Sequence, residues 1–219
     1  MNVKLAFTPI SKTPVDLLAV VLDEETTLHE IDDKRIVEHV ARAAAGFREK
    51  TLKREYFATL GEGASAGAVV VYWSPQLKSW NLWENVKTFT ARTLRLARDY
   101  RMAKVGVVVN ARDSGPFVGK VVEGAVLGGY TFDRYRQEKD EFLAKDASLT
   151  IFVHKDHETD AEARKSRYLW VSDNVNRARD LINEPGAVVT PEVFASTATD
   201  IAREVDLESE TLDPAALEA

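Results

Sequence analysis

Short runs of apolar residues alternate with longer segments of helical periodicity over the first 153 residues. Residues 3–7 alternate apolar and polar side chains, whereas residues 17–22 are apolar throughout, which is typical of a buried central strand. The glycine-rich stretch 61–67 separates two further β-rich runs and predicts a hairpin or a tight connection. With that pair included, the remaining strands are predicted at 56–60, 68–73, 105–109 and 149–153.

Two helices are predicted between these strands. Asp32 or Asp33 can cap the first, because a carboxylate can accept the free backbone N–H groups at a helix start. Its expected apolar face is Ile36, Val37, Val40, Ala44 and Phe47. The second helix covers residues 81–101. Its expected inward residues are Val86, Phe89, Leu96, Ala97 and Tyr100.

A third helix is predicted after the strand at 105–109, with Ser114 as its cap. Gly124 and Gly128 lie one turn apart in it and remove side chains from one face, so the helix can sit close to a neighbouring element. Strands that alternate with helices through short loops predict a three-layer α/β/α domain with a mixed, mostly parallel sheet.

A long helix followed by a stop and a second helix start is predicted after residue 158. Thr159 and Glu162 have the spacing of a capping box, and Pro185 cannot continue a helix. Thr190 and Pro191 supply an N-cap and a first-turn proline for the next helix. The expected apolar faces are Tyr168, Val171, Val175, Ala178 and Ile182 in the first helix, and Phe194, Ala198, Ile201 and Val205 in the second.

These elements predict three regions along the chain. Residues 1–158 form an α/β domain, residues 159–184 a linker helix, and residues 185–219 the start of another domain. The last region is too short to bury a core of its own. We therefore expect its apolar stripe to be exposed in this chain.

Composition limits the class of protein further. The 219 residues include no cysteine, which removes disulfides, thiolate chemistry and cysteine-based zinc sites. No apolar run approaches 18 residues and the N-terminus lacks a signal-peptide pattern, so a cytoplasmic protein without a membrane span is expected. The net charge of −6 argues against nucleic acid as the main partner.

The turn after the strand at 105–109 is the first candidate site. Open α/β sheets bind ligands where a strand passes into a helix, so Asn110 and Ser114 could contact a nucleotide or ADP-ribose. Every strand-to-helix turn shares this location, and a structural role is the favoured interpretation. The glycines of 61–67 lack the lysine of a P-loop and are interpreted as a turn.

Two charged segments are further candidates. Arg92, Arg95, Arg98 and Arg101 recur at every third residue of the second helix and could bind DNA, although a solvated helix face is favoured. His154 and His157 lie beside Asp156 and Asp160 and superficially offer metal ligands. A charged loop ahead of a helix is favoured there, because a catalytic zinc site needs three ligands in a fixed cavity. No catalytic residue can be assigned from spacing.

Two stretches resemble the leucyl (cytosol) aminopeptidase family. Residues 176–194 are similar to the family's A-R-x-L-x-N-x-P element followed by T-P, and residues 123–136 to its E-G-x-x-L-x-x-Y-x-F-D-x-Y-K/R signature. Ala187 departs from the first pattern, where asparagine is usual. The matching residues of the first motif are Ala178, Arg179, Leu181, Asn183, Pro185, Thr190 and Pro191.

The resemblance implies that residues 1–158 are a macro-like N-terminal domain and that residues 185–219 begin a peptidase domain. Family members are usually hexamers that remove N-terminal residues from peptides with a water activated between two divalent metals, zinc or manganese. The family's metal motifs, GKG-x-x-FDSGG and NTDAEGR, do not occur in this sequence. The chain is therefore expected to be inactive alone, with a role in assembly or regulation. The alternative is a stand-alone module that binds a nucleotide-like ligand or DNA. Some bacterial members of the family bind DNA as a second activity.

Overall fold

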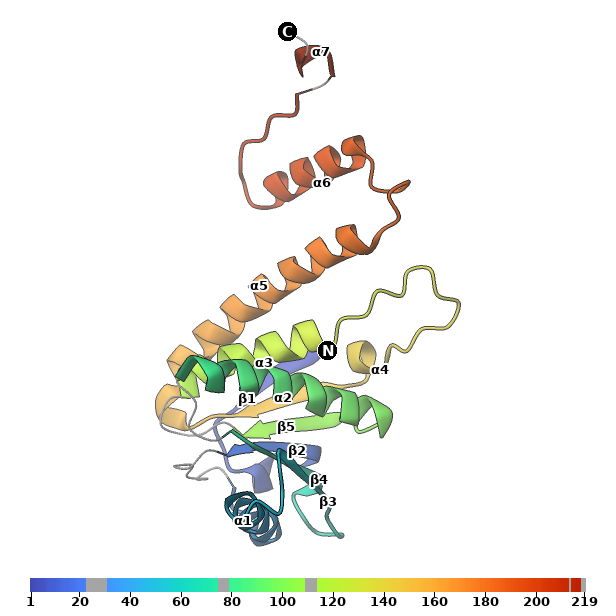
Figure 1. Ribbon diagram of the computed structural model, residues 1–219. Helices are drawn as coiled ribbons and strands as arrows, with labels where there is room; N and C mark the ends of the chain where they lie inside the picture. Colours follow the sequence, from blue (N-terminus) through green and yellow to red (C-terminus); the bar gives the residue numbers. More distant parts are fainter. Residues whose placement is uncertain (23–30, 75–78, 109–113, 213, 218–219) are drawn as a thin grey trace. The chain divides into compact units, whose positions relative to one another are not determined.

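A computed structural model describes residues 1–22, 31–74, 79–108, 114–212 and 214–217. Its centre is a six-stranded sheet in the order β1-β6-β5-β2-β4-β3 (Figure 1). All neighbouring strands are parallel except β3, which is antiparallel to β4. The strands are β1 (Asn2–Ala6), β2 (Val15–Leu22), β3 (Glu55–Thr59), β4 (Ala66–Trp73), β5 (Lys104–Val108) and β6 (Ser148–Phe152). The predicted mixed, mostly parallel sheet is confirmed.

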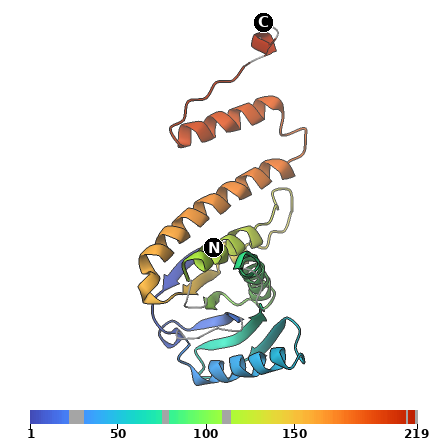
Figure 2. The same cartoon turned by 60° about the vertical axis from the view of Figure 1, so that its left-hand side comes forward.

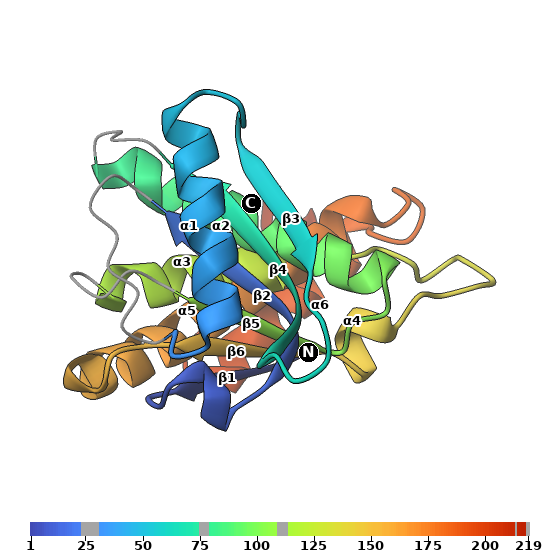
Figure 3. The same ribbon diagram turned by 90° about the horizontal axis from the view of Figure 1, so that it is seen from below.

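Helices cover both faces of this sheet, as the three-layer prediction required. Helix α1 lies on one face, and α2 and α3 lie side by side on the other (Figures 1 and 3). Helix α5 follows β6 and is one continuous helix (Figure 2). The helices are α1 (Lys34–Arg48), α2 (Ser79–Asp99), α3 (Ser114–Gly128), α4 (Phe142–Lys145), α5 (Glu158–Asn183), α6 (Pro191–Glu204) and α7 (Pro214–Leu217), with 3-10 turns at Ile10–Lys12 and Lys155–His157.

Strand β2 divides the hydrophobic core into two halves. Successive side chains of a strand point to opposite faces. In β2, Leu17, Ala19 and Val21 therefore pack under α2 and α3, while the alternate residues pack under α1. Leu17 and Leu18 are both fully buried. Because both faces are covered, the strand must be apolar at every position, which explains the continuous apolar run in the sequence.

Tyr72 of β4 is the largest fully buried side chain in the core. Its ring stacks on Phe89 of α2 with centroids 4.6 Å apart, and its hydroxyl accepts a hydrogen bond of 3.2 Å from Thr93 Oγ1. Burial raises the pKa of Tyr72 to about 12. The hydroxyl therefore stays neutral, and the tyrosine joins the sheet to α2 as a packing residue.

Asp33, one of the two predicted caps, begins α1. Its carboxylate accepts the backbone N–H of Arg35 at 2.9 Å and, from the turn between β3 and β4, that of Ser65 at 2.6 Å. Burial alone would raise the pKa of Asp33, but the hydrogen bonds from Ser65 and Arg35 outweigh it and lower the pKa. Asp32 instead accepts the backbone N–H of Ser11 at 3.1 Å. One carboxylate thus fixes both a helix start and a hairpin turn.

The predicted inner faces of the first two helices are partly wrong. Val37 of α1 is 42% exposed, and Ala43, which was not predicted, is fully buried. Tyr100 was expected to face inward on α2, but the helix ends at Asp99 and Tyr100 is 62% exposed. The N–H of Met102 bonds the carbonyl of Ala97 in a closing turn, which carries Tyr100 out of the helical repeat.

The predicted close approach at Gly124 and Gly128 is confirmed. A Cβ atom at Gly124 would lie 2.3 Å from the backbone carbonyl oxygen of Lys87, and one at Gly128 would lie 2.4 Å from Ala91 Cβ. Both neighbours belong to α2. The backbones of α2 and α3 are therefore in contact, and only glycine fits at these two positions.

Helix α5 begins earlier than predicted and buries a different face. It starts at Glu158, directly after the 3-10 turn that His154 caps, so Thr159 lies inside the helix and does not cap it. The buried residues of α5 are Ala161 and Ser172. The expected apolar face is largely exposed, with Val171 at 42% and Ile182 at 80%.

The chain forms two compact units, Met1–Val175 and Asn176–Ala219. The first contains the whole sheet and its covering helices up to α5, and the second contains the end of α5 with α6 and α7. In the described part of the chain, no helix is long and apolar enough to cross a membrane.

Replacing Gly124 with alanine tests the contact between α2 and α3. We expect Gly124→Ala to lower the free energy of unfolding by about 1–3 kcal/mol, because the new methyl group overpacks the contact. Helix propensity alone would raise it by about 1 kcal/mol. Urea unfolding followed by circular dichroism measures the change.

Gly61→Ala is the matched control, since a Cβ atom there would meet no atom within 4 Å. Its effect should stay within about 1 kcal/mol. An increase in stability for Gly124→Ala would contradict the packing account.

Candidate functional site

Most of the candidate ligand site after β5 lies outside the described residues. Asn110 lies outside the described residues. Ser114 is the first residue of α3, but the position of its side chain is not described. A nucleotide-like ligand at these two residues therefore stays a prediction.

The arginines of α2 are largely paired with carboxylates. Arg92 contacts Glu55 of β3 at 2.8 Å, and Arg98 contacts its neighbour Asp99 at 3.1 Å. Arg95 is exposed and has no ion pair among the described residues. Arg101 was expected to be the last arginine of the helix, but α2 ends at Asp99 and Arg101 lies beyond it with a φ of +55°.

Arg101 belongs instead to a shallow polar depression around α4. Its guanidinium contacts Asp140 at 2.9 Å and lies 5.2 Å from the centroid of the Phe142 ring. The hydrogen bond from Arg101 lowers the pKa of Asp140. The depression has a volume of about 570 Å³. Four basic and four acidic residues surround Phe142 in its lining: Arg101, Arg136, Lys139, Lys145, Glu138, Asp140, Glu141 and Asp146. The formal charges of the lining residues sum to zero.

The histidine pair lies in the turn before α5. The imidazole of His154 accepts the backbone N–H of Asp156 at 3.4 Å, so it serves as the cap of the 3-10 turn. Its ring centroid is 6.4 Å from that of His157. Among the described residues, no group of three or more His, Cys, Asp or Glu side chains could hold a metal ion. These donors do not fit a catalytic metal centre.

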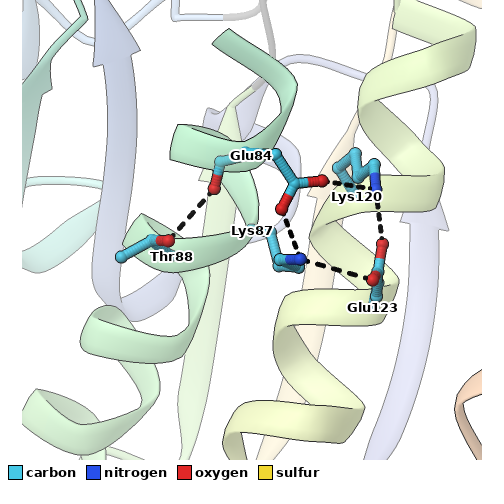
Figure 4. Close-up of polar contacts among 5 residues, drawn as sticks. All are labelled: Glu84, Lys87, Thr88, Lys120 and Glu123. Carbon is cyan, nitrogen blue, oxygen red and sulfur yellow. Dashed lines mark hydrogen bonds and ion pairs between the residues drawn. The ribbon is translucent and has the colours of Figure 1, made fainter. Parts of the chain in front are cut away.

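A network of four charges joins α2 to α3 (Figure 4). Lys120 Nζ lies 2.8 Å from carboxylate oxygens of both Glu84 and Glu123, and Lys87 Nζ lies 3.5 Å from Glu123 and also pairs with Glu84. The side chains of Lys120 and Glu123 are only 18% and 20% exposed. Sequence reasoning missed this network. Each helix shows the pair spacing of three residues, but the cross-helix pairs depend on how α2 and α3 pack.

The charges of the network shift one another's pKa. The hydrogen bond from Lys120, followed by that from Lys87, lowers the pKa of Glu84. Burial alone would lower the pKa of Lys120, but its hydrogen bonds to Glu123 and Glu84 outweigh this and raise it. Both shifts favour the charged forms at neutral pH. The network therefore stabilises the contact between α2 and α3, and it offers no free acid or base for catalysis.

The unit Asn176–Ala219 exposes most of its apolar residues. Thr190 caps α6 as predicted, with its hydroxyl accepting the backbone N–H of Val193 at 3.4 Å. An ion pair of 2.6 Å joins Arg177 of α5 to Glu204 of α6. The predicted stripe on α6 is exposed, as expected, with Phe194 at 60%, Ile201 at 39% and Val205 at 44%. Such a stripe has the character of a surface that another element normally covers.

No family model matches the chain. It is 31% identical to a probable cytosol aminopeptidase of Bradyrhizobium sp., over 99% of this chain and 44% of that protein. It is 36% identical to a protein of the same name from Methylobacterium radiotolerans, over 80% of this chain and 35% of that protein. A third, from Persephonella marina, is 35% identical over 61% of this chain and 26% of that protein. The chain spans less than half the length of these relatives.

Solved structures share the fold. A tomato leucine aminopeptidase variant superposes with a TM-score of 0.67 at 18% identity, over 93% of this chain and 42% of that chain. The bottromycin maturation enzyme BotP superposes with a TM-score of 0.63 at 18% identity, over 93% of this chain and 40% of that chain. BotP has also been solved in complex with manganese.

A double-mutant cycle on Glu84→Gln and Lys120→Met tests the network. We expect a coupling energy of about 0.2–1 kcal/mol at pH 7. The pKa of Glu84 is lower in the folded state, so its contribution is complete above the unfolded pKa of about 4.3 and is lost as the pH falls through the folded pKa. The coupling measured by urea unfolding should therefore be smaller at pH 3 than at pH 7.

The pair Glu141 and Lys145 is the control for this cycle, because both side chains are more exposed. Its coupling at pH 7 should be smaller than that of Glu84 and Lys120. A cycle for Glu84 and Lys120 with no coupling at pH 7, or with the same coupling at pH 3, would refute the assignment.

Proposed function

We propose that this chain, a homologue of the N-terminal region of the cytosol (leucyl) aminopeptidases, is the non-catalytic portion of such an enzyme and serves its assembly or regulation. The observation that carries the proposal is the 31% identity to the Bradyrhizobium protein across 99% of this chain. The same alignment covers 44% of that protein, so more than half of the relative lies outside the aligned region.

The donor groups of the described residues support a non-catalytic role. An aminopeptidase that activates water between two divalent ions, zinc or manganese, needs a cluster of metal-binding side chains. The described residues contain no such cluster, and Glu84 is held in ion pairs with Lys87 and Lys120. We infer that the peptide substrates and the metals of the whole enzyme are bound by residues outside this chain.

We also propose the domain division that the sequence predicts. Residues 1–158 form the N-terminal domain, residues 159–184 the linker helix, and residues 185–219 the start of the peptidase domain. The unbroken course of α5 from Glu158 to Asn183 supports a helical linker, and the exposed stripe of α6 supports a region that packs on further protein. The relatives' names support a cytoplasmic location. Assembly as a hexamer rests on the family resemblance alone.

The direct test is the activity of the purified chain. We expect residues 1–219 to release no chromophore from a leucine chromogenic substrate with added zinc or manganese, because they lack a metal-binding cluster among the described side chains. A full-length relative assayed under the same conditions is the positive control. Robust turnover by residues 1–219 would overturn the proposal.

Binding to DNA is the test of the alternative function. We expect no salt-dependent mobility shift of duplex DNA by the chain, because its net charge is −6 and three of the four candidate arginines, Arg92, Arg98 and Arg101, are already paired with carboxylates. A shift that disappears at high salt, and in a variant with Arg92, Arg95 and Arg98 changed to glutamate, would favour the alternative.

A further inference from the structure

Strand β3 forms one margin of the sheet, with β4 as its only neighbour in the strand order (Figure 3). Such a margin presents a row of backbone N–H and C=O groups that can pair with another strand. Proteins commonly protect it with proline, with a bulge or with charged side chains along the strand. The sequence of β3 is EYFAT, which contains no proline and places its single charge at the first position.

The register between β3 and β4 determines which backbone groups point outward. Leu60 N–H donates to the carbonyl of Gly67 at 2.8 Å, and Trp73 N–H donates to the carbonyl of Arg54 at 3.0 Å. Residues that exchange hydrogen bonds with a neighbouring strand alternate along an antiparallel pair. The backbone N–H and C=O groups of Tyr56 and Ala58 therefore point toward β4. Those of Glu55, Phe57 and Thr59 point outward from the free edge of the sheet.

An exposed aromatic pair lies at the same margin. The ring of Phe57 stacks on that of Tyr100 with centroids 6.1 Å apart, although these residues are 40% and 62% exposed. Glu55, on the same face of β3, pairs with Arg92 of α2. When a second pair of rings packs against these two, more of their exposed apolar surface is removed from water.

We propose that β3 pairs antiparallel with β3 of a second copy of this chain, about a two-fold axis at Phe57. The outward groups permit this register, because Phe57 then exchanges both hydrogen bonds with Phe57 of the second copy, and Glu55 lies opposite Thr59. The two aromatic pairs meet across the axis. A two-fold interface uses the same surface on both copies. Strand β3 meets this condition, because the backbone groups of its central residue, Phe57, point outward and can pair with the same groups of a second copy.

Charge complementarity supports a second copy as the partner. In this register Arg54 lies opposite Leu60 of the second copy, and the turn that follows Leu60 carries Glu62, so the proposed pairing brings Arg54 toward a carboxylate of the other copy. Both side chains are exposed in the single chain, and neither has an ion pair among the described residues. The two-fold axis forms this contact twice. The inference does not depend on the proposed enzymatic family.

Cysteine cross-linking tests the register, and the absence of native cysteine makes the test specific. Hydrogen-bonded residues in an antiparallel pair have Cα atoms about 5.5 Å apart, which suits a disulfide or a short thiol cross-linker. We expect Phe57→Cys to form a covalent dimer. Glu55→Cys alone should not, whereas Glu55→Cys combined with Thr59→Cys should.

A charge exchange at residue 57 tests the same axis without covalent chemistry. Phe57→Lys and Phe57→Glu should each be monomeric in sedimentation equilibrium, because like charges then face each other. An equimolar mixture of the two should recover the dimer. Val37→Lys is the matched control, since Val37 is similarly exposed at 42% but lies on α1, and it should leave the dimer unchanged.

All variants should be made with Phe194→Lys and Ile201→Lys, which remove association through the exposed stripe of α6. A chain that is monomeric at all concentrations in this background would overturn the proposal. So would a dimer that persists in Phe57→Lys, or cross-linking of Phe57→Cys no faster than that of Val37→Cys. Circular dichroism should show that each variant keeps the fold.

Discussion

The burial of β2 on both faces is the constraint on which the first unit depends. A strand with two covered faces needs a helical layer on each side and a neighbour at each edge, and α1, the α2–α3 pair, β4 and β5 meet these needs. The side chains of Leu17 and Leu18 point to opposite layers, so neither layer can be removed without exposing a leucine. In the layer formed by α2 and α3, the contacts of Gly124 and Gly128 with α2 then determine how closely the two helices approach each other.

The sequence predicted the elements better than it predicted their faces. All six strands and the major helices were found, since apolar runs and caps such as Asp33 are local signals. Faces depend on the direction from which the sheet approaches. In α1, Ala43 is buried and Val37 is exposed because of that direction. Tyr100 is exposed because the chain forms a closing turn after α2 and no longer follows the helical repeat. The four-charge network was invisible for the same reason, because its pairs exist only once α2 and α3 are adjacent.

For the candidate sites, too, the sequence revealed the residue types but not the partners of their side chains. The histidines and the arginines have the residue types of a metal site or a DNA site, but their partners in the structure are local: His154 caps a turn and Arg92 neutralises Glu55. Residue type suggests chemistry, whereas the neighbouring groups decide whether a side chain is available for it. Exposed apolar side chains include Phe57 and Tyr100 in the first unit and the stripe along α6 in the second. These surfaces are the basis of the proposed contacts with other protein.

The pairing of β1 with β6 has a consequence for how the chain folds. Asn2 lies opposite Ser148, so the strand that is synthesised first gains its sheet partner only after almost 150 residues have followed. Contacts between residues so distant in sequence carry a high entropic cost of loop closure and form slowly. β2 finds its neighbours β4 and β5 earlier along the chain. On a ribosome the sheet should thus grow outward from β2, and the N-terminal strand should be the last to settle at its edge.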